Sequence, residues 1–359
     1  MLRVREVRPL LAITLALGAI ACQPQAPQQS ASQMSDSDAA SQPTQVFLNG
    51  AGASFPALLY QRWFQEFNRQ HPHIQIDFQP IGSGAGIQQV IAETVDFGAS
   101  DIAMTDDDMA QVDRGVLLLP MTAGSVAIVY NLPGIESGIK LSREIYPKLF
   151  LGEITRWNDP AIASLNPDLD LPNLPIALVH RSDGSGTTAV FTSHLSEISS
   201  DWRDRVGSSL NVQWPAGVGI KSNAGVSAQV QQAEGALGYV EYSYAQQLGL
   251  SVAALENQAG EYVLPDIDSA AQGLNAIALP DDLRAFIPDP DGEGAYPIVT
   301  YSWLLAYRTY DDPAEAEALR QVLQWALAEG QAISPELGYV PLAPDAIDAV
   351  TAAVAQIGT

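Results

Sequence analysis

Short apolar runs alternate with longer amphipathic stretches along most of this chain. The apolar runs have the length of buried strands and lie at 46–48, 74–78, 97–101, 116–119, 176–179 and 237–240. Apolar residues spaced three or four apart indicate helices, and Leu59, Trp63 and Phe67 mark one that is expected to end at His71. Strands that alternate with helices predict an α/β fold with a mainly parallel sheet.

Further helices are expected after the later strands, and several begin with typical capping residues. Ser54 is predicted to be the N-cap of the first helix, with Pro56 in its first turn. Asp312 and Pro313 start a helix that ends at Gly330. The other helices are expected near 87–94, 189–194, 227–233, 242–248 and 344–357.

Two longer strand-like runs are predicted to carry the chain between two lobes. They lie at 123–130 and 296–307. The first lobe would then combine residues 46–122 and 297–359, and the second would span 123–296. With 359 residues, the chain is long enough for two domains of ordinary size.

The N-terminal segment has the pattern of a signal peptide. Basic residues at 3, 5 and 8 precede an apolar run at 10–17 that is too short for an ordinary membrane span. Cys22 is the only cysteine, so no intrachain disulfide can form. Its place after Ala21 resembles a bacterial lipobox, although Ala19 stands where Leu, Val or Ile is preferred. We expect export after removal of 1–21, with lipidation of Cys22 favoured over ordinary cleavage.

The next segment, 22–45, is rich in Gln, Ser, Ala and Pro and has almost no large apolar residue. This composition is typical of a flexible tether. A tether after a lipidated cysteine would let a folded body stand away from the cell-envelope membrane.

The amino-acid composition argues against some classes of binding partner. The chain carries 17 basic and 41 acidic residues, a formal charge of -24, while 47% of its residues are hydrophobic. This balance argues against a broad nucleic-acid or anionic-membrane surface. Any anion must therefore be bound by a local positive site.

The stretch HRSDGSGTT at 180–188 has the features of such a site. It joins a predicted strand to a predicted helix, so backbone N–H groups and the helix dipole favour an anion there. Arg181 supplies a planar fork of donors, and Asp183 is placed to brace it. Ser185 and Thr187 add hydroxyl donors. The alternative interpretation is an ordinary capped connection from strand to helix.

Two other Gly-rich turns, at 50–56 and 82–86, also precede helices and carry hydroxyls. In open α/β sheets ligands bind beyond the carboxyl ends of strands. Three helix starts from two lobes are therefore expected to converge on one small anion.

Four motifs together resemble the PstS family, the phosphate-binding proteins of bacterial ABC-type phosphate importers. They are GAGASFP at 50–56, TVDFGASD at 94–101, RSDGSGT at 181–187 and GALGYVEY at 235–242. The resemblance covers nearly the whole chain after residue 45. It implies a two-lobed, periplasmic-binding-protein-like fold of type II with a two-strand hinge, no enzymatic activity, and a membrane permease as partner. It also implies that Asp183 braces Arg181, and it implies a set of phosphate ligands: Ser54, Phe55, Ser83, Asp101, Arg181, Ser185, Gly186 and Thr187.

Asp101 is the informative member of this set, because a carboxylate repels an anion unless the anion has a proton to donate. Phosphate near neutral pH carries a proton and sulfate does not. We therefore expect Asp101 to reject sulfate. Arsenate mimics phosphate in size and protonation and is not excluded.

A phosphatase or other hydrolase on the same turns is the alternative enzyme class, and a phosphate sensor is a third option. A hydrolase would need a nucleophile with a base, or metal ligands, and no Gly-x-Ser-x-Gly elbow is present. The four histidines show no metal-ligand spacing, and no cofactor or metal is expected. The six tryptophans are expected in the core or between domains, 106–108 at a solvated helix start, and 289–293 in a surface turn.

Overall fold

The computed structural model describes residues 44–275 and 278–359, and residues from Pro43 on form one compact unit. Its main sheet has nine strands in the order β2-β1-β3-β12-β4-β8-β6-β7, with β9 also paired to β4. A small second sheet has the order β11-β10-β5. The strands are β1 (Val46–Gly52), β2 (Ile74–Gln79), β3 (Phe97–Ser100), β4 (Val116–Tyr130), β5 (Lys140–Leu141), β6 (Ala177–Arg181), β7 (Val218–Ile220), β8 (Ala236–Glu241), β9 (Ser251–Val252), β10 (Ala254–Glu256), β11 (Tyr262–Val263) and β12 (Val299–Tyr307).

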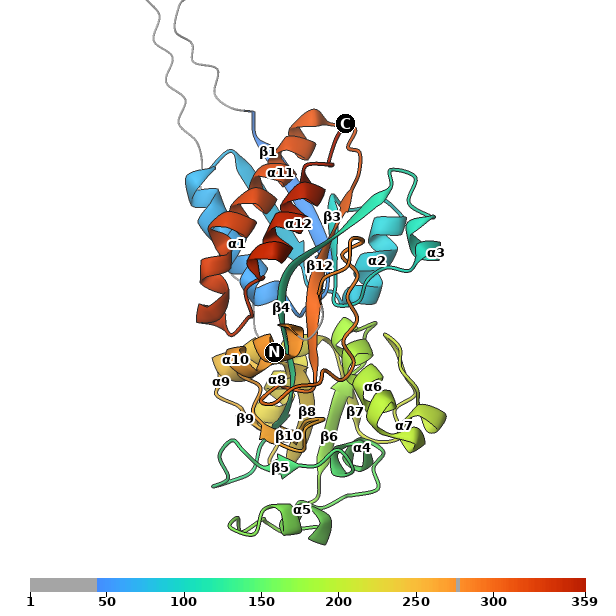
Figure 1. The fold of residues 1–359 in the computed structure, drawn as a ribbon, viewed down its shortest axis with the longest axis vertical. Helices are drawn as coiled ribbons and strands as arrows, with labels where there is room; N and C mark the ends of the chain where they lie inside the picture. Colours follow the sequence, from blue (N-terminus) through green and yellow to red (C-terminus); the bar gives the residue numbers. More distant parts are fainter. Residues whose placement is uncertain (1–43, 276–277) are drawn as a thin grey trace, which may run out of the picture. The chain divides into compact units, whose positions relative to one another are not determined.

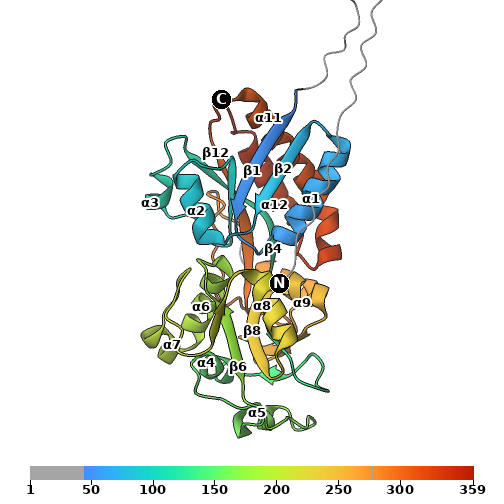
Figure 2. The ribbon, with the colours of Figure 1, turned by 180° about the vertical axis from the view of Figure 1, so that it is seen from behind.

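Helices flank the sheet along its whole length (Figures 1 and 2). Beside β1, β2 and β3 lie α1 (Ala57–Gln70), α2 (Ser83–Ile91), α3 (Asp106–Met109), α11 (Pro313–Ala328), the 3-10 helix η1 (Gly330–Leu337) and α12 (Pro344–Val354). The remaining helices are α4 (Ile145–Phe150), α5 (Pro160–Leu165), α6 (Gly186–Ile198), α7 (Ser200–Arg205), α8 (Ser222–Gln232), α9 (Tyr242–Leu248) and α10 (Ile267–Asn275). The prediction of an α/β fold is confirmed.

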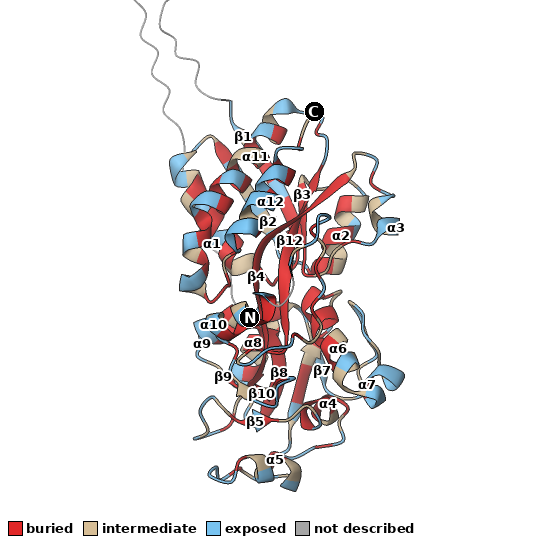
Figure 3. Cartoon of the chain, in the orientation of Figure 1, coloured by how far each residue is buried: buried red, intermediate tan, exposed pale blue. Residues whose placement is uncertain are grey.

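Two central strands join the two halves of the sheet. We call β2, β1 and β3 with their helices the β1 half, and β8, β6 and β7 with their helices the β8 half. Strand β4 pairs with β12 over its first part and with β8 from Val126 to Tyr130. Both strands are buried along their full length (Figure 3). Strands β1, β2 and β3 are parallel, as are β8, β6 and β7, whereas β4 and β12 are antiparallel to their neighbours.

The prediction of two separate strands at 116–119 and 123–130 is wrong, because β4 runs through both as one strand of 15 residues. Pro120 lies between the two predicted runs, and proline has no N–H for the ladder. The register between β4 and β12 instead shifts at Ser302 and Trp303, and Trp303 is the partner of Pro120. Ser302 pairs with Thr122 and Trp303 with Pro120, so Met121 is an extra residue in β4, directly after the proline.

Several helix starts also differ from the prediction, since α6 begins at Gly186 and α8 at Ser222, before the expected residues 189 and 227. Helix α2 begins at Ser83, not at residue 87, because Gly82 (φ 99°) makes the turn and the later glycines are helical. Ser54 is not the N-cap of α1: that position is Pro56, without a side-chain cap, and the Ser54 hydroxyl bonds to Asn223 instead.

The predicted apolar faces form the core. Leu59, Trp63 and Phe67 of α1 are fully buried. The apolar spacing also predicts an inward face on α11, and its residues Leu319, Val322, Leu323, Trp325, Ala326 and Leu327 are buried. Trp157, Trp202 and Trp303 are also core residues.

The predictions for 1–21 and Cys22, and nearly all of the 22–45 tether, lie outside the described residues. Within residues 44–275 and 278–359, none of the helices combines the length and the apolar character that a membrane span requires.

Candidate functional site

The turn after β6 holds a buried arginine that is fixed from one side. Arg181 is only 3% exposed, and its Nε and Nη2 atoms donate to the carboxylate of Asp183 at 2.8 and 2.5 Å. Its third nitrogen, Nη1, is buried without a hydrogen-bond partner in the described part of the chain. Although burial raises the pKa of Asp183, the hydrogen bonds and charge of Arg181 bring it below its usual value. The guanidinium is thus rigid and has one free donor edge.

Asp101, just beyond the end of β3, is the second buried charge-bearing group. Its Oδ1 accepts a hydrogen bond from Ser302 at 2.9 Å, and its backbone N–H donates to Ser83 Oγ at 3.2 Å. Burial raises the pKa of Asp101 to about 7, although hydrogen bonds and the charge of Arg181 act in the opposite direction. The carboxyl group can therefore gain or lose a proton near neutral pH.

Glycine lets the turn before α6 approach Asp101 and Ser83 closely. A Cβ atom on Gly186 would lie 2.3 Å from Ser83 Oγ and 2.7 Å from Asp101 Oδ2. The two Gly-rich turns also touch, since Gly84 N donates to Gly184 O at 2.9 Å. Any larger side chain at Gly186 would force these groups apart.

Ser54 and Thr187 come from opposite halves and share one partner, Asn223. The Asn223 Nδ2 atom lies 3.1 Å from Ser54 Oγ and 3.2 Å from Thr187 Oγ1. All three residues are buried, and Tyr244 OH of the β8 half donates to Ser54 O at 2.7 Å. Asn223 was not among the predicted site residues, because no local pattern marked it.

Ser185 and Phe55 complete the predicted set. Ser185 is the N-cap of α6, and its Oγ accepts from Thr188 N at 3.0 Å. Phe55 is fully buried, directly before α1, and Tyr339 donates to its carbonyl at 2.6 Å. The starts of α1, α2 and α6 thus supply the predicted residues other than Arg181 and Asp101, and helix N-termini favour anions. We call the eight predicted residues the cradle: Ser54, Phe55, Ser83, Asp101, Arg181, Ser185, Gly186 and Thr187.

A second buried carboxyl group lies beside the cradle. Glu241 accepts from Ser243 N at 2.9 Å, and a Cβ atom on Gly124 would touch both Glu241 and the Phe55 ring. Burial raises the pKa of Glu241 to about 8, against the effect of the Ser243 hydrogen bonds. Glu241 was not among the predicted site residues, although it lies inside the motif at 235–242, and no local pattern marked Ser302.

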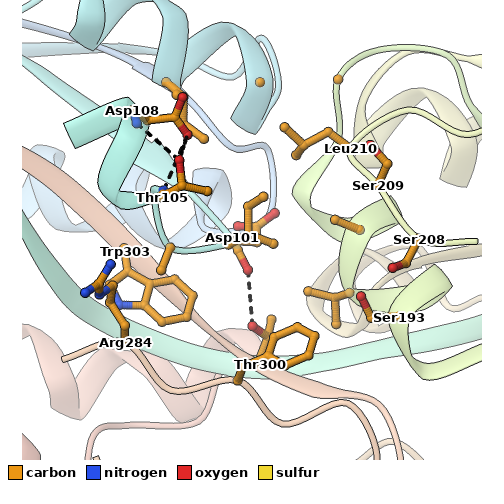
Figure 4. Close-up of a pocket in the computed structure, with 18 of the residues that line it drawn as sticks. Asp101, Thr105, Asp108, Ser193, Ser208, Ser209, Leu210, Arg284, Thr300 and Trp303 are labelled. Atoms are coloured by element: carbon orange, nitrogen blue, oxygen red, sulfur yellow. Dashed lines mark hydrogen bonds between the residues drawn. The ribbon is translucent and has the colours of Figure 1, made fainter. Parts of the chain in front are cut away.

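A cavity of about 820 Å³ lies next to the cradle, between α2 and α6. Figure 4 shows Asp101 in the middle of its lining, where Thr300 donates to the Asp101 carbonyl. Asp101 is the one cradle residue that lines it, although Gly84 and Gly184 do so as well. The cavity is therefore adjacent to the cradle and not part of it.

Two acidic segments outside the cradle have structural roles. Residues 106–108 form the start of α3, with a capping box made by Thr105 and Asp108. The prediction of a surface turn at 289–293 is wrong for Asp289, whose side chain is 4% exposed and pairs with both terminal nitrogens of Arg143 at 2.7 and 2.8 Å. In the described part of the chain, no three His, Cys, Asp or Glu side chains are grouped as a metal site would need.

Known sequences place the chain among substrate-binding proteins. The model of the "PBP superfamily domain" matches residues 34–329. The phosphate-binding protein PstS of Xylella fastidiosa strain Temecula1 is 39% identical, with 96% of each chain covered. PstS of Pasteurella multocida is 40% identical over 85% of this chain and 89% of its own.

Solved structures show the same fold. A "high affinity periplasmic phosphate-binding protein (PfluDING) bound with phosphate" has a TM-score of 0.69 and 20% identity, covering 86% of this chain and 93% of that one. A phosphate-binding protein from Stenotrophomonas maltophilia has a TM-score of 0.67 and 21% identity, covering 86% and 93%.

The raised pKa of Asp101 predicts a pH-dependent gain in stability for Asp101→Asn. Between about pH 4 and pH 7 the folded protein keeps a proton that the unfolded chain releases, so stability from this group is present at low pH and is lost as pH rises. In buffers without oxyanions we expect Asp101→Asn to raise the free energy of unfolding by about 2–4 kcal/mol at pH 8 and by little at pH 4.

Urea unfolding at both pH values measures this difference. The exposed Asp77→Asn is the control for a change in net charge. An effect of Asp101→Asn that is equal at the two pH values would contradict the prediction.

Proposed function

Because the chain belongs to the PstS family of phosphate-binding proteins, we propose that it binds inorganic phosphate in the cradle and delivers it to the membrane permease of an ABC-type phosphate importer. The observation that carries the proposal is the guanidinium of Arg181. Burying a charge is costly, and Asp183 satisfies only two of its three nitrogens. A tetrahedral oxyanion at Nη1 would supply the missing acceptor.

The other cradle residues supply donors suited to the remaining oxygens. The hydroxyls of Ser54, Ser83, Ser185 and Thr187 and the backbone N–H groups of Phe55 and Gly186 would donate to the anion. No further charge is needed, because three helix starts add positive potential at the same place. This matters in a chain of net charge -24, where the long-range field repels anions.

Asp101 would then act as an acceptor for the proton of bound phosphate. Sulfate has no such proton, so its oxygens would face a carboxylate without a hydrogen bond between them. Arsenate carries the same proton and would not be rejected by this group.

We propose that the molecule closes around phosphate as two lobes, 46–122 with 297–359 and 123–296, with β4 and β12 as the hinge. These two strands join the halves, and the bonds from Gly84 to Gly184 and from Asn223 to Ser54 cross between them. Contacts from both halves exist only when the halves are together, so a ligand held by both would favour closure.

The proposed role is binding without turnover. The histidines nearest the turn after β6 are engaged elsewhere: His180 bonds to the Arg181 carbonyl, and His194 bonds to Tyr146 and the Pro288 carbonyl. None of these contacts activates a cradle hydroxyl as a nucleophile. Release of phosphate from p-nitrophenyl phosphate would contradict this role.

The first prediction concerns the guanidinium. Arg181→Lys keeps the charge but loses the fork that binds Asp183 and the anion together, so we expect phosphate affinity to fall on the order of 100-fold. Isothermal titration calorimetry of the dialysed protein measures it. Arg205→Lys, at an exposed pair with Glu153, is the matched control and should bind like the wild type. Equal affinities for Arg181→Lys and the wild type would argue against the cradle as the site.

The second prediction concerns anion selectivity. Asp101→Asn replaces the acceptor by an amide that can donate to sulfate, so we expect the ratio of phosphate to sulfate affinity to fall at least about 10-fold. Titrations with phosphate, arsenate and sulfate at pH 8 measure the ratio, with Asp77→Asn as control. An unchanged ratio would remove Asp101 from the proposed selectivity.

The third prediction concerns export. We propose that 1–21 is removed as a signal peptide, that Cys22 is lipidated, and that 22–45 tethers the folded body in the periplasm. Mass spectrometry of the membrane fraction of a Gram-negative host should find a lipid-modified N-terminus at Cys22, and Cys22→Ser should abolish it. An unmodified N-terminus in the soluble fraction would show ordinary cleavage instead.

A further inference from the structure

We propose that Asn223 is a positioning residue that makes Ser54 and Thr187 donate their hydroxyl protons to the bound anion. The proposal rests on the proposed function, because it concerns how the same cradle presents its donors. Asn223 lies in the first turn of α8 and has no exposed surface.

The orientation of the Asn223 amide follows from its surroundings. Its Oδ1 accepts from the backbone N–H of Glu241 at 3.2 Å. A flipped amide would place its NH2 group against that N–H, with two donors facing one another. The NH2 group must therefore face Ser54 Oγ and Thr187 Oγ1, at 3.1 and 3.2 Å.

The Ser54 hydroxyl is left with only its proton to offer. A hydroxyl has two acceptor lone pairs and one donor. Ser54 Oγ accepts from both the backbone N–H and the side chain of Asn223, at 3.2 and 3.1 Å. With both lone pairs used, the hydroxyl can interact with a further group only by donating to it, which suits an anion and excludes a donor.

Thr187 is oriented in the same way by the second proton of the amide. Its Oγ1 accepts from Asn223 Nδ2 at 3.2 Å, which occupies one of its two lone pairs and turns the hydroxyl proton away from the amide. One buried amide thus donates to two hydroxyls that belong to opposite halves of the molecule. The Ser54 hydroxyl is set only when the halves meet, so closure and donor orientation are coupled.

The affinity of Asn223→Ala for inorganic phosphate tests the proposal. Without the amide, both hydroxyls can rotate and donate elsewhere, so we expect affinity to fall by about 10-fold to 100-fold. Asn131→Ala is the matched control: its amide donates to the carbonyls of Val230 and Gln231 at the other end of the same helix. This control should bind phosphate like the wild type.

A double-mutant cycle separates positioning from a merely structural role. In a Ser54→Ala/Thr187→Val background Asn223 has no hydroxyl left to orient. Asn223→Ala should then lower the affinity for phosphate by less than about 3-fold. The same fold-loss in both backgrounds would overturn the proposal. If Asn223→Ala does not unfold cooperatively without ligand, the same double-mutant cycle is measured with Asn223→Ser in its place. A wild-type protein that bound no phosphate would instead overturn the proposed function itself.

Discussion

A buried guanidinium held by one carboxylate is the interaction on which the rest of the site depends. Arg181 could not be buried alone, because an unpaired charge inside a protein costs several kcal/mol. Asp183 binds two of its nitrogens and is itself held by the backbone N–H of Ser222 at 3.2 Å. The pair leaves one donor edge of fixed direction. In a strongly acidic chain this edge is a local source of positive charge that no long-range field provides.

Near this edge lie Asp101 and Ser54, and the surroundings of each decide whether it donates or accepts a hydrogen bond. The pKa of Asp101, raised to about 7, makes it an acceptor or a donor according to pH. Ser54 can only donate, because Asn223 occupies both of its lone pairs. If the cradle binds phosphate as proposed, these groups would distinguish ligands by where their protons lie, and not only by size or charge.

The division of the sheet supports the proposed closure. Strands β4 and β12 run through both halves and are buried throughout, so they join the halves without a flexible linker. Glycine at 84, 184 and 186 lets the helix starts of the two halves come into backbone contact. Donors from both halves therefore reach the same small volume.

The sequence by itself determined the alternation of strands and helices, the buried faces of α1 and α11, and the polar turns that carry the cradle. These features are local: apolar spacing, capping residues and glycine act within a few residues. Only the tertiary structure decided that β4 passes through Pro120 as one strand, that Asp289 is buried against Arg143, and that Asn223, Ser302 and Glu241 surround the cradle. Each of these features depends on a contact with a residue far along the chain. The spacing of apolar residues in the sequence does not show which distant residues meet.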